Sequence, residues 1–134
     1  MAYNILIVDD SKIVRTVIQR AVELSGADVG TIYQAANGQE ALDKLGAEWV
    51  DIVFADINMP VMDGVKMVEE MARRGLAQDI PVVIVSSDRS EIRMQQLKEH
   101  GVREYLNKPF TPESIRDILV TCLKERGPEG APGV

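Results

Sequence analysis

The sequence predicts a doubly wound α/β sandwich, in which helices cover both faces of a mostly parallel sheet. Short β-branched runs alternate five times with longer segments whose apolar residues recur at helical spacing. Strands of continuous apolar character, separated by crossover helices, are typical of sheets that are buried on both faces. With 134 residues and 46% hydrophobic residues, the chain has the size and composition of one domain with its own core.

The five predicted strands are short, and each is followed by a predicted helix. The strands are expected at 5–8, 31–35, 52–55, 82–85 and 104–106. The helices are expected at about 11–25, 39–45, 63–74, 88–100 and from 111 onward. Gly26, Gly46 and Gly75 follow the first three helices, where a glycine can end a helix in the left-handed conformation.

Apolar spacing predicts which face of each helix is buried. In the first helix the inward face is expected to consist of Ile13, Val14, Val17, Ile18, Ala21 and Val22. The last helix is expected to point Ile115, Ile118, Leu119 and Leu123 inward. The fourth helix has only Ile92, Met94 and Leu97 as apolar anchors, so we expect it to be mobile or to face a partner.

Composition excludes several classes of protein. A formal net charge of -6 and a pI near 4.8 argue against a surface that binds nucleic acid directly. Apolar runs of only about four residues argue against insertion into a membrane. A single cysteine, Cys122, cannot form an intramolecular disulfide, and this favours a cytoplasmic protein. We expect one domain over residues 1–125, followed by a disordered Gly- and Pro-rich tail at 126–134.

The ends of the predicted strands carry polar side chains that can act together. In an open parallel sheet, ligands bind beyond the carboxyl ends of the strands. The polar residues expected there are Asp9, Asp10, Asp56, Ser86, Ser87 and Lys108. Three carboxylates brought together repel one another unless a cation lies among them. Oxygen ligands favour Mg²⁺, with Mn²⁺ as a substitute, and Mg²⁺ keeps positions open for further oxygen ligands such as those of a phosphoryl group.

Asp56 is the carboxylate that we expect to react. A carboxylate can attack phosphorus to give an aspartyl phosphate if the charge on the transferring group is neutralised, here by Mg²⁺ and Lys108. Asp56 stands alone after the third strand, whereas Asp9 and Asp10 are adjacent and better suited to hold a metal ion. Ser86 is expected to donate to a phosphoryl oxygen, and the backbone carbonyl of Asn58 is a further candidate metal ligand.

Each residue also has a simpler interpretation when it is taken alone. The aspartate pair and Ser86 are suited to capping helices, and Lys108 to carrying a solvated charge. Asp56 fits a turn before Pro60. Their convergence on one edge of the sheet favours the functional interpretation.

The motifs resemble those of the receiver domain of two-component response regulators over residues 3–124. The segments that carry the resemblance are Ile-Val-Asp9-Asp10-Ser, Asp56-Ile-Asn-Met-Pro60 followed by Asp63-Gly64, Val-Ser86-Ser87 and Tyr105-Leu-Asn-Lys108-Pro109-Phe110. The resemblance implies a flavodoxin-like three-layer sandwich with five parallel strands in the order 2-1-3-4-5 and five helices. In domains of this family the bond that corresponds to Lys108-Pro109 is commonly cis.

The resemblance implies a role for each matched residue. Asp9, Asp10, Asp56 and Asn58 would bind Mg²⁺, with Asn58 acting through its carbonyl. Asp56 would be the phosphoacceptor, and Ser86 and Lys108 would complete the pocket. Ser86 and Tyr105 would act as the switch, although Tyr105 is equally well explained as a half-buried strand aromatic. Asn58 and Asp88 occupy positions that influence the rate of hydrolysis of the aspartyl phosphate.

The resemblance also implies partners. The phosphoryl donor would be a histidine kinase or a histidine phosphotransfer protein. The surface of the fourth helix, fifth strand and fifth helix would control a downstream protein, and a phosphatase is a further candidate partner. The chain is expected to be a stand-alone regulator of the chemotaxis or relay type, or else the isolated receiver of a larger transcription factor or output enzyme. It is expected to be monomeric, or dimeric when phosphorylated, and to be a switch rather than an enzyme, apart from self-phosphorylation and slow autodephosphorylation.

Three other classes of protein fit the sequence less well than a receiver domain does. A phosphohydrolase of the haloacid dehalogenase type pairs its nucleophile with a second aspartate two residues on, where this chain has Asn58. A dinucleotide-binding enzyme needs glycines after the first strand, where this chain has Asp-Asp-Ser-Lys. An unphosphorylated scaffold on the same fold would have no need of a full set of pocket residues.

Overall fold

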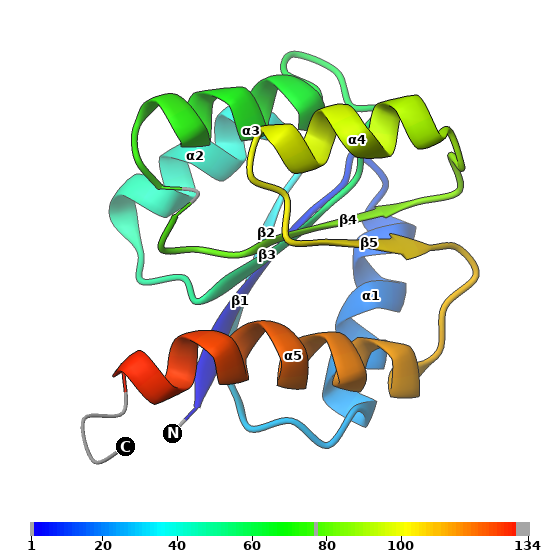
Figure 1. The fold of residues 1–134 in the computed structure, drawn as a ribbon. Helices are drawn as coiled ribbons and strands as arrows, with labels where there is room; N and C mark the ends of the chain where they lie inside the picture. The colour runs from blue at the N-terminus through cyan, green and yellow to red at the C-terminus, as the bar shows by residue number, and fades with distance from the viewer. Residues whose placement is uncertain (1, 77, 131–134) are drawn as a thin grey trace.

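A computed structural model of the chain describes residues 2–76 and 78–130 and shows five strands alternating with five helices (Figure 1). The elements are β1 Tyr3–Val8, α1 Lys12–Leu24, β2 Val29–Ala35, α2 Gly38–Ala47, β3 Ile52–Ala55, α3 Gly64–Arg73, β4 Val82–Ser86, α4 Glu91–Glu99, β5 Glu104–Asn107 and α5 Pro112–Gly130. All neighbouring strands pair in parallel in the order β2-β1-β3-β4-β5. The predicted fold class and strand order are confirmed.

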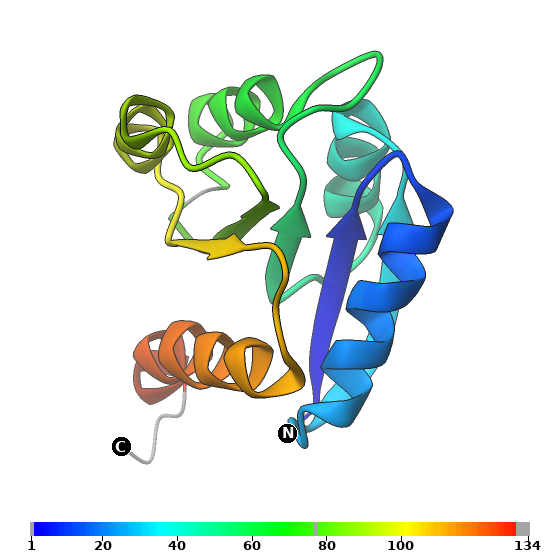
Figure 2. The same cartoon turned by 90° about the vertical axis from the view of Figure 1, so that its right-hand side faces the viewer.

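The molecule has three layers. Helices α1 and α5 cover one face of the sheet, and α2, α3 and α4 cover the other (Figures 1 and 2). Each face has its own apolar core because side chains alternate along every strand. Ile5, Ile7 and Phe54 pack toward α1 and α5, whereas Leu6 and Val53 pack toward the other three helices. The central strands are thus buried on both faces, which explains their unbroken apolar sequences.

Side-chain caps fix where four of the helices begin. The side chains of Ser11, Asn37, Asp63 and Ser90 each accept a hydrogen bond from a backbone N–H in the first turn of α1, α2, α3 and α4, respectively. Asn37 and Gly38 therefore form a cap and a helix start. These four helices begin at the carboxyl edge of the sheet, which is the edge predicted to hold the site.

Several helix predictions were wrong in detail. On α1, Ile13 and Val17 are 76% and 52% exposed, so the buried face is narrower than expected. The α2 helix continues through Gly46 to Ala47. The α4 helix begins at Glu91 rather than at residue 88, because Ser90 caps it and the preceding residues form a loop. On α4, Ile92 is 75% exposed, and Leu97 is the only buried anchor.

The C-terminal part of the chain is described up to Gly130, where α5 ends. The α5 helix thus extends over 126–130 of the predicted disordered tail, whereas 131–134 lie outside the described residues, where disorder stays a prediction. The inward side chains of α5 are as expected, since Ile115, Leu119 and Leu123 are buried. Within the described residues, no helix combines the length and the apolar character needed to cross a bilayer.

Candidate functional site

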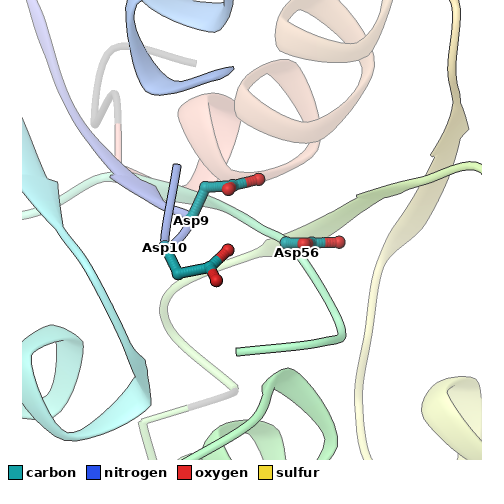
Figure 3. A group of neighbouring side chains, drawn as sticks. All are labelled: Asp9, Asp10 and Asp56. Atoms are coloured by element: carbon teal, nitrogen blue, oxygen red, sulfur yellow. The ribbon is translucent and has the colours of Figure 1, made fainter. Parts of the chain in front are cut away.

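Three carboxylates meet at the carboxyl ends of β1 and β3. The backbone N–H of Asp56 donates to the carbonyl of Val8 at 2.9 Å, and the N–H of Asp9 donates to the carbonyl of Ala35 at 3.1 Å. These bonds extend the pairing of the strands by one residue and fix both aspartates at the same edge. One oxygen from each of Asp9, Asp10 and Asp56 lies within 4.8 Å of the others (Figure 3). The predicted convergence of the three aspartates is confirmed.

Burial makes Asp9 and Asp56 costly to ionise. The pKa of Asp9 lies above its ordinary value, chiefly because Asp9 is only 2% exposed, with further repulsion from Asp56 and Asp10. Opposing this, the Ser11 N–H donates to Asp9 Oδ1 at 2.9 Å. Burial likewise raises the pKa of Asp56, against the Ile57 N–H that donates to its Oδ1 at 2.8 Å. Both acids are therefore held where their negative charge is poorly solvated.

The donor set fits a hard divalent cation. The buried Oδ2 of Asp9 has no hydrogen-bond partner among the described residues. A buried carboxylate oxygen without a partner is costly, and a metal ion beside the three carboxylates would satisfy it. Asn58 follows Asp56 by two residues and has an exposed side chain, and its backbone N–H helps to lower the pKa of Asp56. Its role as a carbonyl ligand stays a prediction.

Lys108 brings a positive charge to the cluster. Its Nζ lies 3.9 Å from Asp9 Oδ2, and its backbone N–H donates to the carbonyl of Ser86 at 3.0 Å, which fixes its Cα to the end of β4. The Lys108-Pro109 bond is cis, as expected. The ammonium is within reach of the position that a group bound at the three carboxylates would occupy.

Ser86 and Tyr105 are joined through the loop between β4 and α4. Ser86 is 4% exposed, and its Oγ accepts a hydrogen bond from the N–H of Asp88 at 3.1 Å. The Tyr105 hydroxyl donates to the carbonyl of Asp88 at 2.6 Å. Burial raises the pKa of Tyr105, and its hydrogen bond with Ser86 opposes this rise. The two predicted switch residues thus bind the backbone of Asp88, Ser86 at its N–H and Tyr105 at its carbonyl. Ser87 is exposed.

The side chain of Asp88 is directed to α4. Its Oδ1 accepts from the N–H of Ser90 at 2.9 Å, and its Oδ2 lies 3.4 Å from Nε of Arg93. These contacts tie the loop after β4 to the first turn of α4. Ser86, which binds the N–H of Asp88, is therefore connected to that helix through Asp88.

The loop between β3 and α3 is fixed by close backbone approaches. A Cβ on Gly64 would clash with the carbonyl oxygen of Asp56, and the Gly64 N–H donates to the carbonyl of Ile57 at 2.7 Å. The Gly38 N–H donates to the carbonyl of Met62 at 2.8 Å, which fastens the same loop to α2. Val61 has a φ of 65°, a strained conformation for a β-branched residue. The loop that follows Asp56 is therefore tied by backbone hydrogen bonds both to itself and to α2.

Two contributors to the site were not predicted from the sequence. Gly64 was part of a recognised motif, but the close approach that requires a glycine is visible only in three dimensions. Arg15 reaches from α1 to the backbone of Asp9, and its Nη1 donates to the Asp9 carbonyl at 2.5 Å. A lone arginine on a helix gives no sequence signal for such a contact.

Comparison with known proteins identifies the class. Residues 5–120 match the model of the response regulator receiver domain. The chain is 31% identical over 129 residues to a chemotaxis protein CheY homolog of Campylobacter jejuni, covering 96% of this chain and 98% of that protein. It is 36% identical over 124 residues to the transcriptional regulatory protein PrrA of Mycobacterium tuberculosis, covering 92% of this chain and 51% of PrrA.

A solved structure agrees with these matches. A chain in the crystal structure of the CheX-CheY-BeF3-Mg²⁺ complex from Borrelia burgdorferi superposes with a TM-score of 0.76 at 28% identity, covering 89% of this chain and 87% of that one. The chain belongs to the response regulator receiver family of two-component signalling. Proteins of this family interact with histidine kinases and with downstream targets.

Proposed function

We propose that the protein is a phosphorylation switch in which Asp56 accepts one phosphoryl group. The observation that carries the proposal is the cluster of Asp9, Asp10 and Asp56 with Lys108 beside it. The fold and the family of the chain are those for which the sequence predicted such a cluster. The buried Asp9 Oδ2, which has no hydrogen-bond partner among the described residues, supports Mg²⁺ as the cofactor. The CheX-CheY complex from Borrelia burgdorferi, to which this chain is similar, contains Mg²⁺.

The proposed step is a transfer between a histidine and Asp56. A carboxylate oxygen of Asp56 attacks phosphorus, the bond from phosphorus to the donor's imidazole nitrogen breaks, and the imidazole keeps the electron pair and takes up a proton. Mg²⁺, when bound, would neutralise charge on the transferring oxygens. Lys108 would pair with one phosphoryl oxygen, and the Ser86 hydroxyl would turn to donate to another. Hydrolysis by water later restores Asp56 and releases phosphate.

The signal would leave the site through the loop after β4. If the Ser86 Oγ turns toward a phosphoryl group on Asp56, it gives up the N–H of Asp88. That backbone also accepts the Tyr105 hydroxyl and carries the side chain tied to Arg93. The expected outcome is a population shift in the α4-β5-α5 surface, stabilised by new charge-assisted hydrogen bonds. Asn58 and Asp88 would tune how long the aspartyl phosphate lasts.

The partners follow from this mechanism. The donor would be a histidine kinase or a histidine phosphotransfer protein, and the target would bind the α4-β5-α5 surface. The near full-length match to a chemotaxis CheY homolog favours a stand-alone chemotaxis-type or relay regulator, whereas the match to half of PrrA keeps the receiver of a larger regulator as the alternative. A phosphatase and phosphorylation-dependent dimerisation belong to the same proposal, as does a cytoplasmic location. Beyond self-phosphorylation and slow autodephosphorylation, we propose no enzymatic activity.

Mass spectrometry of the intact protein tests the proposal. Incubation with Mg²⁺ and acetyl phosphate should add the mass of one phosphoryl group, and chelation of Mg²⁺ should prevent the addition. Asp56→Asn should abolish it, because the amide is not a nucleophile toward phosphorus. Asp63→Asn is the matched control: Asp63 lies on the same loop, and asparagine caps α3 as well as aspartate does. An unmodified wild type, or a modified Asp56→Asn, would refute the proposal.

A further inference from the structure

Arg15, on the first turn of α1, reaches back over the loop that carries Asp9 and Asp10. Its Nη1 donates to the carbonyl of Asp9 at 2.5 Å, and its Nε donates to Oε1 of Gln34 at 3.0 Å. Gln34 on β2 is oriented in turn by Gln19, whose Oε1 accepts from Nε2 of Gln34 at 2.7 Å. Gln34 of β2 thus orients the guanidinium, which in turn binds the carbonyl of the peptide group between Asp9 and Asp10.

We propose that Arg15 is a positioning residue for the metal site, which fixes the peptide between Asp9 and Asp10 so that both carboxylates converge with Asp56. The inference rests on the proposed function, since it concerns the same metal site. Arg15 does not contact the bound cation in this role; it acts through the backbone of Asp9.

The contacts of Asp9 explain why this peptide needs to be held. The N–H of Asp9 is fixed by Ala35, and its Oδ1 by the N–H of Ser11. The carbonyl of Asp9 belongs to the peptide that leads into Asp10, so its direction sets the direction in which the Asp10 side chain leaves the backbone. Asp10 is exposed, and packing therefore does little to orient it. Arg15 supplies the constraint that packing does not.

Charge and positioning make opposite predictions for Arg15. A guanidinium bound to the Asp9 carbonyl carries a positive charge near the metal site and repels a divalent cation, so removing its charge alone would strengthen Mg²⁺ binding. Removing a group that orients metal ligands weakens binding, typically by ten- to a hundredfold for groups that hold the ligands. The sign of the change in affinity therefore separates the two roles.

Calorimetric titration of the unphosphorylated protein with Mg²⁺ tests the inference. Arg15→Ala should weaken Mg²⁺ binding by about tenfold. Arg15→Lys should be intermediate, because a single ammonium nitrogen can donate to the Asp9 carbonyl but lysine has no second donor nitrogen in the position of Nε to bind Gln34. Arg20→Ala is the matched control, since it removes the same charge from an exposed position on the same helix, and it should leave the affinity unchanged or slightly higher. Affinity in Arg15→Ala equal to or tighter than that of wild type would overturn the inference.

A second variant keeps the test decisive if Arg15→Ala does not fold. Gln34→Leu retains Arg15 and its charge but removes the side chain that orients the guanidinium. It should weaken Mg²⁺ binding less than Arg15→Ala, and unchanged binding in Gln34→Leu and Arg15→Lys together would refute the inference. If the wild type binds Mg²⁺ and takes up a phosphoryl group, and the variants bind Mg²⁺ as tightly as the wild type does, only the role of Arg15 is overturned. A wild type that does not bind Mg²⁺ would overturn the proposed function as well.

Discussion

Helices α3 and α4 lie on the same face of the sheet and have similar lengths, yet they are anchored very differently (Figure 2). The α3 helix buries Gly64, Met67, Val68 and Met71. The α4 helix buries only Leu97. Its remaining described ties include two partly exposed ion pairs, Asp88 with Arg93 and His100 with Glu69, the second of which is charged only when His100 is protonated. Partly exposed pairs of this kind contribute little.

In the proposed switch, the loops before these two helices have different roles. The loop that leads into α3 carries Asp56, and it is fixed by close backbone contacts. The loop that leads into α4 carries Asp88, which connects Ser86 to Tyr105. Local stability is low where few apolar contacts are buried, and segments that move in switches come from such regions. In the proposed switch, the reacting aspartate would thus lie on a firmly packed support, and the response would occur in a helix with one buried anchor.

The largest effect is expected from breaking the rigid side. Gly64→Ala places a Cβ against the carbonyl oxygen of Asp56, a backbone atom that cannot move without shifting the site. We expect a loss of about 3 kcal/mol in the free energy of unfolding, together with weaker Mg²⁺ binding. Gly46→Ala is the control, because a Cβ there meets nothing within 4 Å, and it should be neutral or stabilising. Urea unfolding of both variants measures the difference, and equal stabilities would contradict the account.

A loss of stability of similar size is expected at the single buried anchor of α4. Leu97→Ala should cost about 3 kcal/mol, since it removes a fully buried side chain. Ile92→Ala on the same helix removes a side chain that is 75% exposed, so it should change stability by less than about 0.5 kcal/mol. Denaturant unfolding checks both values. A large loss for Ile92→Ala would mean that α4 is held by more than Leu97.

A smaller effect is expected at the connection between β5 and the loop. Tyr105→Phe removes the hydroxyl that donates to the Asp88 carbonyl at 2.6 Å, and we expect a loss of about 1 kcal/mol with phosphorylation of Asp56 unchanged. Tyr33→Phe is the control, because its hydroxyl makes only an exposed contact of 3.4 Å with Glu48. Thermal unfolding and intact-mass analysis give the two readouts. Loss of phosphorylation in Tyr105→Phe would show that Tyr105 belongs to the chemistry rather than to the response.

The smallest effect is a gain that depends on pH. Burial raises the pKa of Asp9 above its ordinary value of 3.8, so the folded state binds that proton more tightly than the unfolded state does. The free energy of unfolding then falls as the pH rises from the ordinary pKa toward the raised one, because the buried carboxylate must lose its proton in the folded state. Asp9→Asn should therefore be more stable than wild type at pH 7, and the gain should shrink toward pH 4. Thermal unfolding without Mg²⁺ measures this, and a gain that grows at low pH would contradict it.

Much of the candidate site could be predicted from the sequence, because the apolar runs show where each strand ends. Once 5–8 and 52–55 are strands of one parallel sheet, Asp9 and Asp56 must lie at the same edge. The exposed Ile13 and Val17 could not be predicted, because both share the helical spacing of the buried residues. Which stripe of α1 is covered depends on where the sheet and α5 lie.

Contacts of side chains with backbone atoms also could not be predicted from the sequence. The partner of the Tyr105 hydroxyl is a carbonyl in a loop 17 residues away, and the partner of Arg15 is the carbonyl of Asp9. Every residue has a carbonyl, so the sequence does not show which one is used. The same holds for Gly64, whose need for a missing Cβ comes from the position of the Asp56 carbonyl.

Hydrogen exchange with and without a phosphoryl mimic tests the central claim most directly. The protein would be compared alone and with Mg²⁺ plus beryllofluoride, a tetrahedral mimic of the phosphoryl group, using Asp56→Asn as the control. We predict that amide protection changes in the loop at 87–90 and in α4, stays the same in α3, and does not respond in Asp56→Asn. Unchanged protection in α4, or an equal change in α3, would contradict the division between a rigid reacting side and a responsive side.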